Sequence, residues 1–407
     1  MQIIFFEDKK IANFFPLAMY RTVAEFLRGT GSPIQHAMRH FPYTIIIPGH
    51  ALGHIDYEEI AKEIEKSPLT SFIFVNSRIR SISILKQIQE RDTCYVSDND
   101  LVALWASKEK ALDTLQEIKQ SGGIWDPDLS CRKTHALANP TLYEYIWQML
   151  EDNYCEIEEA ESSWSEFQAQ PSSSIMRNEK VFIKKTAKIS PFAVLDARRG
   201  SIFIDEFAEI APFSYLEGPL YVSQYAKIQG GKVGKGTSIG SYSIVNGEIE
   251  NSIIFDYTNK YHDGFIGHSI IGSWVNIGAQ TVTSDLKNNY SQIRIQLASN
   301  RIYTTNLIKL GSIIGDHSKT AIGTLLNSGT TVGIGCNVIG NGLQPKYFPS
   351  FCWGGSEGFK EYDLAKFLET ATKVMSRRDY KGAKKELRHL RRLFGITRSD
   401  RQDFIQR

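Results

Sequence analysis

Cysteine is scarce in this sequence, and no two cysteines form a Cys-x-x-Cys pair. The five that occur are scattered along the 407 residues, at Cys94, Cys131, Cys155, Cys336 and Cys352. This spacing excludes a zinc knuckle and a disulfide framework, and it is typical of reduced thiols. We therefore expect a cytoplasmic protein.

Long apolar runs and an excess of one charge are lacking as well. No run approaches the about 18 apolar residues that a membrane span requires. The opening Met1–Asp8 turns acidic too soon for a signal peptide. The net charge of +2 favours no particular class of partner. We expect neither a membrane nor a nucleic acid as partner, and the length predicts two or three domains.

A six-residue repeat dominates the second half of the chain, from about residue 183 to 342. In one unbroken run the aliphatic residues are Ile204, Ile210, Leu216, Val222 and Ile228. A helix would repeat apolar residues at three and four, and a lone strand at two. The interval of six instead predicts short parallel strands, joined by tight corners and stacked into a prism. Each aliphatic side chain then packs on the one a full coil above.

The same interval recurs later in the chain. It is carried by Phe265, Ile271 and Ile277, and then by Ile314, Thr320, Leu326, Val332 and Val338. A polar and basic excursion, about 285–308, separates these runs. Insertions in repeat proteins often lie on the face that binds ligands. The Asn, Lys and Arg side chains of this excursion suit a phosphorylated or nucleotide-bearing ligand.

Residues 1–150 alternate strand-like and helix-like segments. We expect strands at Gln2–Phe6, Tyr43–Pro48, Ser71–Asn76 and Thr93–Ser97. We expect helices at Leu17–Arg28, Tyr57–Lys66, Ile82–Gln89 and Lys108–Lys119. This alternation predicts a parallel sheet covered on both faces, with ligands at the carboxyl ends of the strands. The polar residues at those ends are Glu7, Asp8, Asn76, Arg78, Asp98 and Asp100.

The remaining segments connect and close this arrangement. We interpret 151–178 as an acidic connection, 179–356 as the repeat domain and 357–407 as a basic helical tail. The tail could be a nucleic-acid patch, or it could dock on the rest of the protein and pair with the acidic connection; we adopt docking. Aromatic residues within 344–355 are expected to cap the open end of the prism.

His262 is the candidate for acid–base chemistry because it lies where the repeat falters. Its neighbours are Lys260 and the later Asn276. An imidazole can take a proton from an amine or hydroxyl that attacks an acyl donor. The alternative is a histidine with a structural role only.

Two motifs carry a resemblance to a known family. Val-Asn-Ile-Gly-Ala-Gln-Thr-Val-Thr at 275–283 and Lys-Leu-Gly-Ser-Ile-Ile-Gly-Asp at 309–316 resemble the acetyltransferase half of the GlmU enzymes. The resemblance implies a left-handed parallel β-helix, a homotrimer and acetyl-CoA as acyl donor. It implies that His262 is the catalytic base, and that Asn276 and Lys309 position substrate or stabilise the oxyanion.

The same resemblance marks further residues and some departures. Lys260, Asp285 and Asn289 are candidate substrate-binding residues. Phe265 stands where the family has a tyrosine. Gln280 replaces a glycine at a corner where acetyl-CoA passes.

The N-terminal half resembles the GlmU-like sugar nucleotidyltransferase family. Phe15–Gly29 carries a Pro-Leu…Val-Ala-Glu motif, and Phe74–Arg80 carries an Asn-x-Arg element. The resemblance implies the joining of a sugar 1-phosphate to a nucleoside triphosphate with Mg²⁺. The phosphates would be bound by Arg21, Arg28, Asn76 and Arg78, and the metal by Asp8 and Asp98. The usual glycine-rich phosphate loop is missing near 7–16.

These observations leave three functions open. The first, which we adopt, is a two-domain enzyme of sugar-nucleotide metabolism, with an α/β Rossmann-like nucleotidyltransferase domain, a β-helix acyltransferase domain and a helical tail. The second is a non-catalytic trimeric scaffold or sensor that binds sugar nucleotides, which the departures at Phe265 and Gln280 favour. The third is a nucleotidyltransferase whose β-helix serves only to trimerise.

Overall fold

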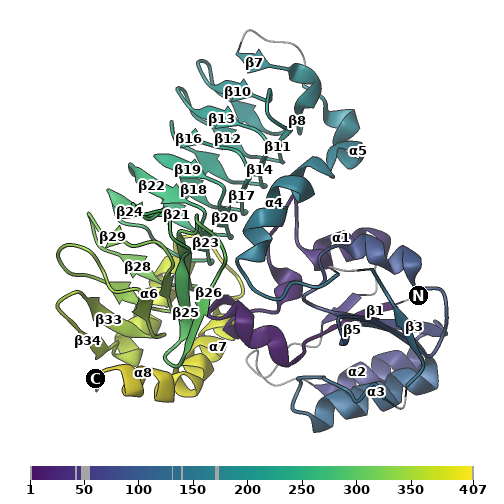
Figure 1. The fold of residues 1–407 in the computed structure, drawn as a ribbon. Coiled ribbons are helices and arrows are strands. Elements are labelled where there is room, and N and C mark those ends of the chain that lie inside the picture. Colours follow the sequence, from purple (N-terminus) through teal and green to yellow (C-terminus); the bar gives the residue numbers. More distant parts are fainter. Residues whose placement is uncertain are drawn as a thin grey trace. The chain divides into compact units, whose positions relative to one another are not determined.

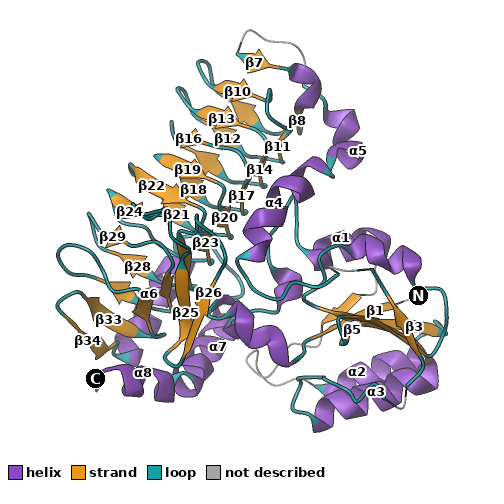
Figure 2. Ribbon diagram, viewed as in Figure 1, coloured by secondary structure: helices purple, strands orange, loops and turns teal. Residues whose placement is uncertain are grey.

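The structure is a computed structural model that describes residues 2–41, 44–46, 56–130, 132–138, 141–169 and 174–405. The chain divides into two compact units. One comprises Met1–Phe26 and Gly31–Ile146, and the other comprises Leu27–Thr30 and Trp147–Arg407. Figure 1 follows the chain by colour, and Figure 2 shows that the first unit mixes helices and strands whereas the second is mainly strands.

A six-stranded sheet in the order β2-β1-β3-β5-β4-β6 forms the centre of the N-terminal unit. Its strands are β1 Gln2–Phe6, β2 Thr44–Ile46, β3 Ser71–Asn76, β4 Thr93–Ser97, β5 Asp100–Ser107 and β6 Thr134–Ala136. The strand predicted at 43–48 is confirmed as β2 at Thr44–Ile46. Tyr43, Ile47 and Pro48 lie outside the described residues. The predicted parallel sheet is wrong in one respect, because β5 runs antiparallel to both β3 and β4.

The predicted helices of this unit are confirmed where the segment has a single apolar face. Both α2 (Tyr57–Lys66) and α3 (Lys108–Gln120) are α-helices, and α1 covers Pro33–His40. The predicted helix at 17–28 is instead two 3₁₀ turns, η2 (Leu17–Met19) and η3 (Val23–Glu25). The Thr22 side chain caps the second turn and Glu25 completes a capping box, so a new turn starts there. The predicted helix at 82–89 is also a 3₁₀ turn, η4 (Ile82–Gln87).

Apolar cores lie on both faces of this sheet, as predicted. Ile3, Phe5, Ile73 and Val75 belong to one core, which Ala37 of α1 joins. Alternate residues of the same strands belong to the other core, together with residues of α2 and α3: Ile4, Phe6, Phe72, Phe74, Ile64, Ala111, Leu115 and Ile118. The alternation follows from the two-residue period of a strand.

The second unit contains the predicted parallel β-helix, whose three faces are sheets of stacked parallel strands. The first face is formed by β7 Ile175–Met176, β10 Val194–Asp196, β13 Tyr215–Glu217, β16 Lys232–Val233, β19 Glu248–Glu250, β22 Gly264–Gly267, β24 Thr281–Thr283 and β29 Leu325–Leu326. The second face is formed by β8 Val181–Ile183, β11 Ile202–Ile204, β14 Leu220–Val222, β17 Thr237–Ile239, β20 Ile253–Ile254, β23 Ile270–Ile271, β27 Ser312–Ile314, β30 Thr330–Val332 and β32 Tyr347–Phe348.

The third face is divided into two sheets. Its first part holds β9 Lys188–Ile189, β12 Glu209–Ile210, β15 Lys227–Ile228, β18 Ile244–Val245 and β21 Asn259–Lys260. Its second part holds β28 Lys319–Thr320, β31 Asn337–Val338, β33 Cys352–Gly355 and β34 Gly358–Glu361. Only β34 is antiparallel to its neighbour. The predicted aromatic cap at 344–355 therefore adds a last coil, in which Phe348 and Cys352 join the core.

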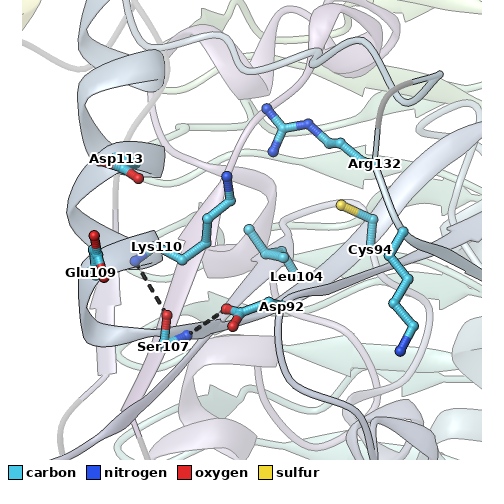
Figure 3. Close-up of a pocket in the computed structure, with 9 residues that line it drawn as sticks. Asp92, Cys94, Leu104, Ser107, Glu109, Lys110, Asp113 and Arg132 are labelled. Carbon is cyan, nitrogen blue, oxygen red and sulfur yellow. Dashed lines mark hydrogen bonds between the residues drawn. The ribbon is translucent and has the colours of Figure 1, made fainter.

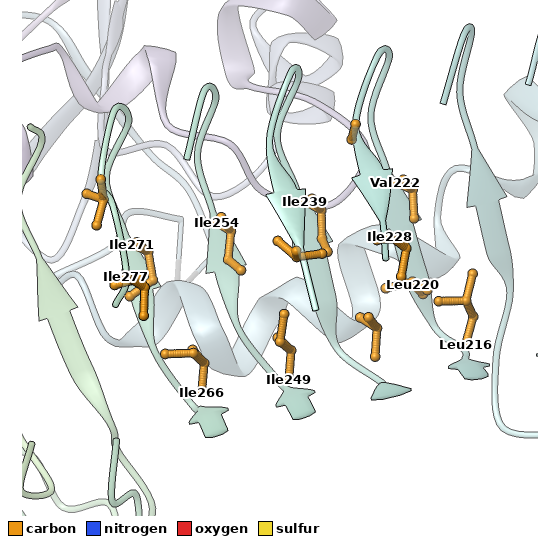
Figure 4. Close-up of a cluster of buried hydrophobic side chains, with 14 of the residues drawn as sticks. Leu216, Leu220, Val222, Ile228, Ile239, Ile249, Ile254, Ile266, Ile271 and Ile277 are labelled. Atoms are coloured by element: carbon orange, nitrogen blue, oxygen red, sulfur yellow. The ribbon is translucent and has the colours of Figure 1, made fainter. Parts of the chain in front are cut away.

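One continuous core fills the β-helix. Figure 4 shows aliphatic side chains of successive coils stacked in files, among them Ile239, Ile254 and Ile271. Burying one such side chain stabilises the folded state by about 1.5–3 kcal/mol. A single coil gains none of this stabilisation, because the burial requires a neighbouring coil. The register differs from the prediction at one place: Ile266 is buried opposite Ile249, whereas Phe265 points outward and is half-buried.

The excursion at 285–308 folds as a hairpin, and the tail folds as helices. The hairpin pairs β25 (Arg294–Ala298) with β26 (Arg301–Thr304), and a bridge between Leu286 and Lys309 closes its base. The tail forms α6 Leu364–Ser376, α7 Ala383–Ile396 and α8 Arg398–Ile405. No helix among the described residues has the length and apolarity needed to cross a membrane.

The tail docks on the last coils of the β-helix. Arg401 donates to Glu361 at 2.7 Å, and the Tyr347 hydroxyl donates to Asp400 at 2.5 Å. The acidic connection forms α4 (Gln148–Glu158) and α5 (Glu161–Trp164). Its carboxylates face the first coils, because Glu158 accepts from the Ser201 amide and Glu161 pairs with Lys180. These contacts lie on different coils, and the pairing of tail and connection stays a prediction.

Candidate functional site

His262 lies at the corner between the third and first faces, which residues 261–263 form after β21. Its side chain is exposed, and its ring meets the edge of Tyr261 at a centroid distance of 5.2 Å. An exposed imidazole at a corner can reach a ligand that lies along the outside of the prism. The predicted base is thus accessible, although no other predicted catalytic side chain touches it.

Lys260 is turned into the core, opposite its predicted role in substrate binding. Its residue is 1% exposed and stands in register with the aliphatic Val245. Its ammonium donates to the carbonyl of His262. A Cβ on Gly247 would lie 3.0 Å from the Lys260 Nζ, so this glycine leaves the space that the amine occupies. Burial lowers the pKa of Lys260 to about 8, although Asp263 opposes the shift. Lys260 therefore fixes the backbone at His262.

Asn276 lies beside the His262 corner, on the outer surface of the third face. Its Oδ1 accepts from Asn259 Nδ2 at 2.9 Å, one coil below. Lys319 follows one coil above, and its Nζ donates to the His317 carbonyl at 3.1 Å. Burial lowers the pKa of Lys319 to about 8. The sequence analysis missed Lys319, although it opens one of the regular six-residue blocks.

A second cluster lies at the corner between the first and second faces. His268 Nδ1 and Asp285 Oδ2 are 2.6 Å apart, and each side chain is 14% exposed. Burial raises the pKa of Asp285, but the hydrogen bond and charge of His268 and the charge of Lys309 outweigh it and hold the pKa below its ordinary value. The ring of Phe265 covers Gly267 beside this pair. The structure thus joins the predicted Asp285 and Lys309 to a histidine that had been given no role.

The strand β22 separates the two clusters within one chain. His262 precedes this strand and His268 follows it. Four residues of strand span about 13 Å, which is beyond the reach of one small substrate group. Asn289 belongs to neither cluster, because its Oδ1 accepts from the Ser291 amide at 3.1 Å and shapes the turn of the excursion.

The N-terminal unit brings Asp8, Asn76 and Arg78 together at the carboxyl ends of β1 and β3, where they were expected. Asn76 Nδ2 donates to Asp8 Oδ2 at 2.7 Å, and Arg78 Nε donates to Asp8 Oδ1 at 2.9 Å. Arg78 is fully buried and also donates to Asp100 at 2.9 Å. Lys10 extends the network from Asp100 to Glu144, at 3.0 and 2.9 Å.

This network does not fit a Mg²⁺ ion held by Asp8 and Asp98. Both carboxylate oxygens of Asp8 accept from the Arg78 guanidinium, at 2.9 and 2.5 Å. Asp98 is exposed in the two-residue turn between β4 and β5, with a φ of 50°. Within the described ranges, no three Asp, Glu, His or Cys side chains gather in a way that could hold a metal ion.

The two remaining arginines do not join this network. The Arg21 guanidinium lies 5.1 Å from the centre of the Tyr20 ring. Arg28 belongs to the second unit, where it pairs with Glu156 at 3.1 Å and has a side chain only 6% exposed. Its predicted role in phosphate binding is therefore replaced by a structural ion pair.

A cavity of about 380 Å³ lies away from the network of Asp8 and Arg78, and residues of β4, β5 and α3 line it. Figure 3 shows Lys110 and Cys94 pointing into it, with Arg132 above them. Burial raises the pKa of the Cys94 thiol, so this sulfur is a poor nucleophile at neutral pH. None of the predicted site residues lines this cavity.

Comparison with known proteins supports the predicted resemblance. Residues 3–164 match the sugar nucleotidyl transferase family. The bifunctional protein GlmU of Methanocaldococcus jannaschii is 32% identical over 120 residues, which cover 29% of this chain and 27% of that protein. A bifunctional sugar-1-phosphate nucleotidylyltransferase/acetyltransferase of Sulfurisphaera tokodaii is 29% identical over 86 residues, or 21% of each chain. The expectation of a GlmU-like, two-domain chain is confirmed.

The solved structures that resemble this chain cover about half of it. One is the UDP-N-acetylglucosamine acyltransferase of Francisella novicida, at 14% identity and a TM-score of 0.28, covering 51% of this chain and 74% of that one. Another is the N-acyltransferase AntD of Bacillus cereus, solved with dTDP and coenzyme A, at 15% identity and a TM-score of 0.23, covering 48% and 88%. The chain spans about a quarter of the length of the curated relatives above.

Proposed function

We propose that this protein is a GlmU-like enzyme of sugar-nucleotide metabolism, in which the β-helix transfers an acetyl group from acetyl-CoA to the amine of an amino sugar phosphate. The observation that carries the proposal is the His262 corner. There the imidazole is exposed, the backbone carbonyl of His262 accepts from the buried Lys260, and the Asn259–Asn276 amide pair lies beside the corner. The relatives named as bifunctional nucleotidylyltransferase/acetyltransferase support this assignment.

The chemistry needs one proton carrier and one oxyanion donor. The amine nitrogen forms a bond to the thioester carbonyl carbon while His262 takes a proton from that nitrogen. The C–S bond then breaks, and the proton passes to the departing thiolate of coenzyme A. Asn276 or Lys309 stabilises the oxyanion in the tetrahedral intermediate.

Replacement of His262 by alanine tests this assignment. We expect kcat for acetyl transfer to fall by about 10²–10⁴-fold, measured as thiol release from acetyl-CoA with hexosamine phosphates. The matched control is His135→Ala, an exposed histidine of the N-terminal unit, which should leave kcat unchanged. Full activity in a folded His262→Ala protein would contradict the assignment.

The N-terminal unit provides a second activity in this proposal, the joining of a sugar 1-phosphate to a nucleoside triphosphate. The match to the sugar nucleotidyl transferase family favours it. Asn76 and Arg78 are engaged with Asp8, so we assign no step to these two side chains or to a metal held by Asp8. Pyrophosphate release from nucleoside triphosphates with sugar 1-phosphates would support transfer. Calorimetric binding without release would select the sensor instead.

The oligomeric state that we propose is a homotrimer. Its support is the separation of His262 from Asp285 and Lys309 by β22, because a neighbouring copy can bring the two kinds of corner together. The acceptor would then bind between chains, with coenzyme A along the same groove.

A further inference from the structure

Three cations gather on the outside of the β-helix without an acidic partner. Lys287 and Arg294 belong to the excursion, and Lys346 immediately precedes β32. Among the described residues, no ion pair joins any of the three to a carboxylate. This sets them apart from the exposed lysines Lys227 and Lys232, which pair with Glu209 and Glu248 across the coils.

The fold places the three side chains together. The Lys287 ammonium donates to the Gln292 carbonyl at 2.6 Å, two residues before Arg294 begins β25. The strand β25 contacts both β30 and β32. Lys346 is fixed in turn, because its carbonyl accepts from the Thr331 amide of β30 at 2.8 Å.

Electrostatics agrees with this geometry. Burial lowers the pKa of Lys346, and the charges of Lys287 and Arg294 lower it further. No carboxylate opposes this shift, although Asp400 accepts from Tyr347 on the next residue. Holding like charges together raises the free energy of the unliganded protein, and an anion relieves this repulsion.

An aromatic ring accompanies the cations. Tyr290 is 67% exposed, and its amide donates to the Lys287 carbonyl at 2.9 Å, so it closes the turn that carries Lys287. Its solvated ring, on the turn that carries Lys287, offers a face on which a nucleobase can stack. Cations and an open ring on one surface suit a phosphorylated nucleotide better than a simple ion.

From these contacts we infer that Lys287, Arg294 and Lys346 form a binding site for the phosphates of a nucleotide, with Tyr290 against its base. Acetyl-CoA, whose nucleotide end carries a 3′-phosphate and a diphosphate, is the ligand that matches three cations. Its role as the acyl donor rests on the proposed acetyl transfer, but the binding site does not. A sugar nucleotide shares the diphosphate chemistry and is the other source to be tested.

Binding of coenzyme A to the full-length protein tests the site. Arg294→Gln and Lys346→Gln should each raise Kd about tenfold, and the double variant more, because each removes a charge-assisted contact. Affinity should also fall with added salt. The matched control is Arg301→Gln, an exposed arginine on the other strand of the same hairpin, which should bind coenzyme A as the wild type does.

Three comparisons decide the outcome. If dephospho-coenzyme A binds less tightly than coenzyme A and UDP binds weakly, the donor is the ligand. If UDP-sugars bind and respond to the same variants, the site is a nucleotide site for sugar nucleotides. If the double variant binds both ligands like the wild type, or Arg301→Gln weakens binding equally, the inference is overturned.

The proposed acetyl transfer and the proposed nucleotide-binding site can be refuted independently of each other. Loss of coenzyme A binding in the double variant, without any acetyl transfer by the wild type, would keep the site and remove the enzyme. Acetyl transfer that depends on His262 but keeps its KM for acetyl-CoA in the double variant would keep the enzyme and remove the site.

Discussion

Lys260 carries an ammonium group in a position where its neighbours in the file are aliphatic. Its pKa is lowered to about 8 by burial, from an ordinary value of 10.5. Between these two values the unfolded chain binds more protons at this residue than the folded chain does. The free energy of unfolding therefore rises with pH across that interval, and the cost of burying the charge is complete below pH 8.

We expect Lys260→Met to remove this dependence. In the wild type the free energy of unfolding should rise by up to about 3 kcal/mol from pH 8 to 10.5 through this residue. The variant should be more stable than the wild type at pH 7 and show a smaller rise, measured by urea unfolding at both ends of the range. Lys227→Met is the control, because Lys227 faces outward and pairs with Glu209.

Residue chemistry was predicted best where a motif marked it. His262 and Asn276 lie on the surface near one corner, while their catalytic roles stay a prediction, and Asp8, Asn76 and Arg78 do meet. Lys260 was predicted to bind substrate and is instead buried. A pattern of apolar residues does not reveal that a lysine occupies a core position. The pair His268–Asp285 was missed, because its members are brought together only when one coil stacks on another.

Within one element, the coil, a glycine controls how closely neighbours stack. Gly278 belongs to the Asn-Ile-Gly-Ala motif, and a Cβ there would lie 2.4 Å from the Ala321 carbonyl oxygen of the next coil. That contact is with backbone, which cannot move without separating the coils. The motif therefore has a packing reason as well as a functional one.

We expect Gly278→Ala to lower the free energy of unfolding by about 1–3 kcal/mol, the usual cost of overpacking. Thermal and urea unfolding measure the change. The control is Gly395→Ala in α7, where nothing lies within 4 Å of the added Cβ; there alanine should be neutral or stabilising. Equal stability of Gly278→Ala and the wild type would show that the coils can separate freely.

Element types followed from the sequence more readily than their pairing. The six-residue interval predicted the β-helix, but Phe265 was placed in the core. Along the chain the inward-facing residues are Ile254, Lys260 and Ile266, so the six-residue interval is unbroken and only its middle residue is polar. The antiparallel strand β5 was not predicted. Asp98 and Asn99, both at positive φ, form the hairpin turn that reverses the chain between β4 and β5.

At the scale of the whole molecule, the separation of His262 from Lys309 can be tested by asking whether two chains together form one active site. His262→Ala and Lys309→Ala, each purified alone, should show little acetyl transfer. Co-expressed and isolated as mixed trimers, they should recover about a third of the wild-type activity, because one interface in three of a mixed trimer pairs the two intact residues.

The result depends on chains exchanging during assembly, so the two variants carry different tags and the mixed species is purified through both. Mixing His262→Ala with itself under both tags is the control for the purification. If the mixed protein is as inactive as its parents, each site is complete within one chain, and the trimeric site is refuted.

By itself the sequence determined the β-helix, the α/β unit before it and the helical tail, because the periods of six, two and 3.6 are local properties of the chain. Only the tertiary structure decided which side chains face inward, that Arg78 occupies the carboxylates expected to hold a metal, and that three cations meet beside the hairpin. These depend on contacts between distant segments, and no local pattern records them.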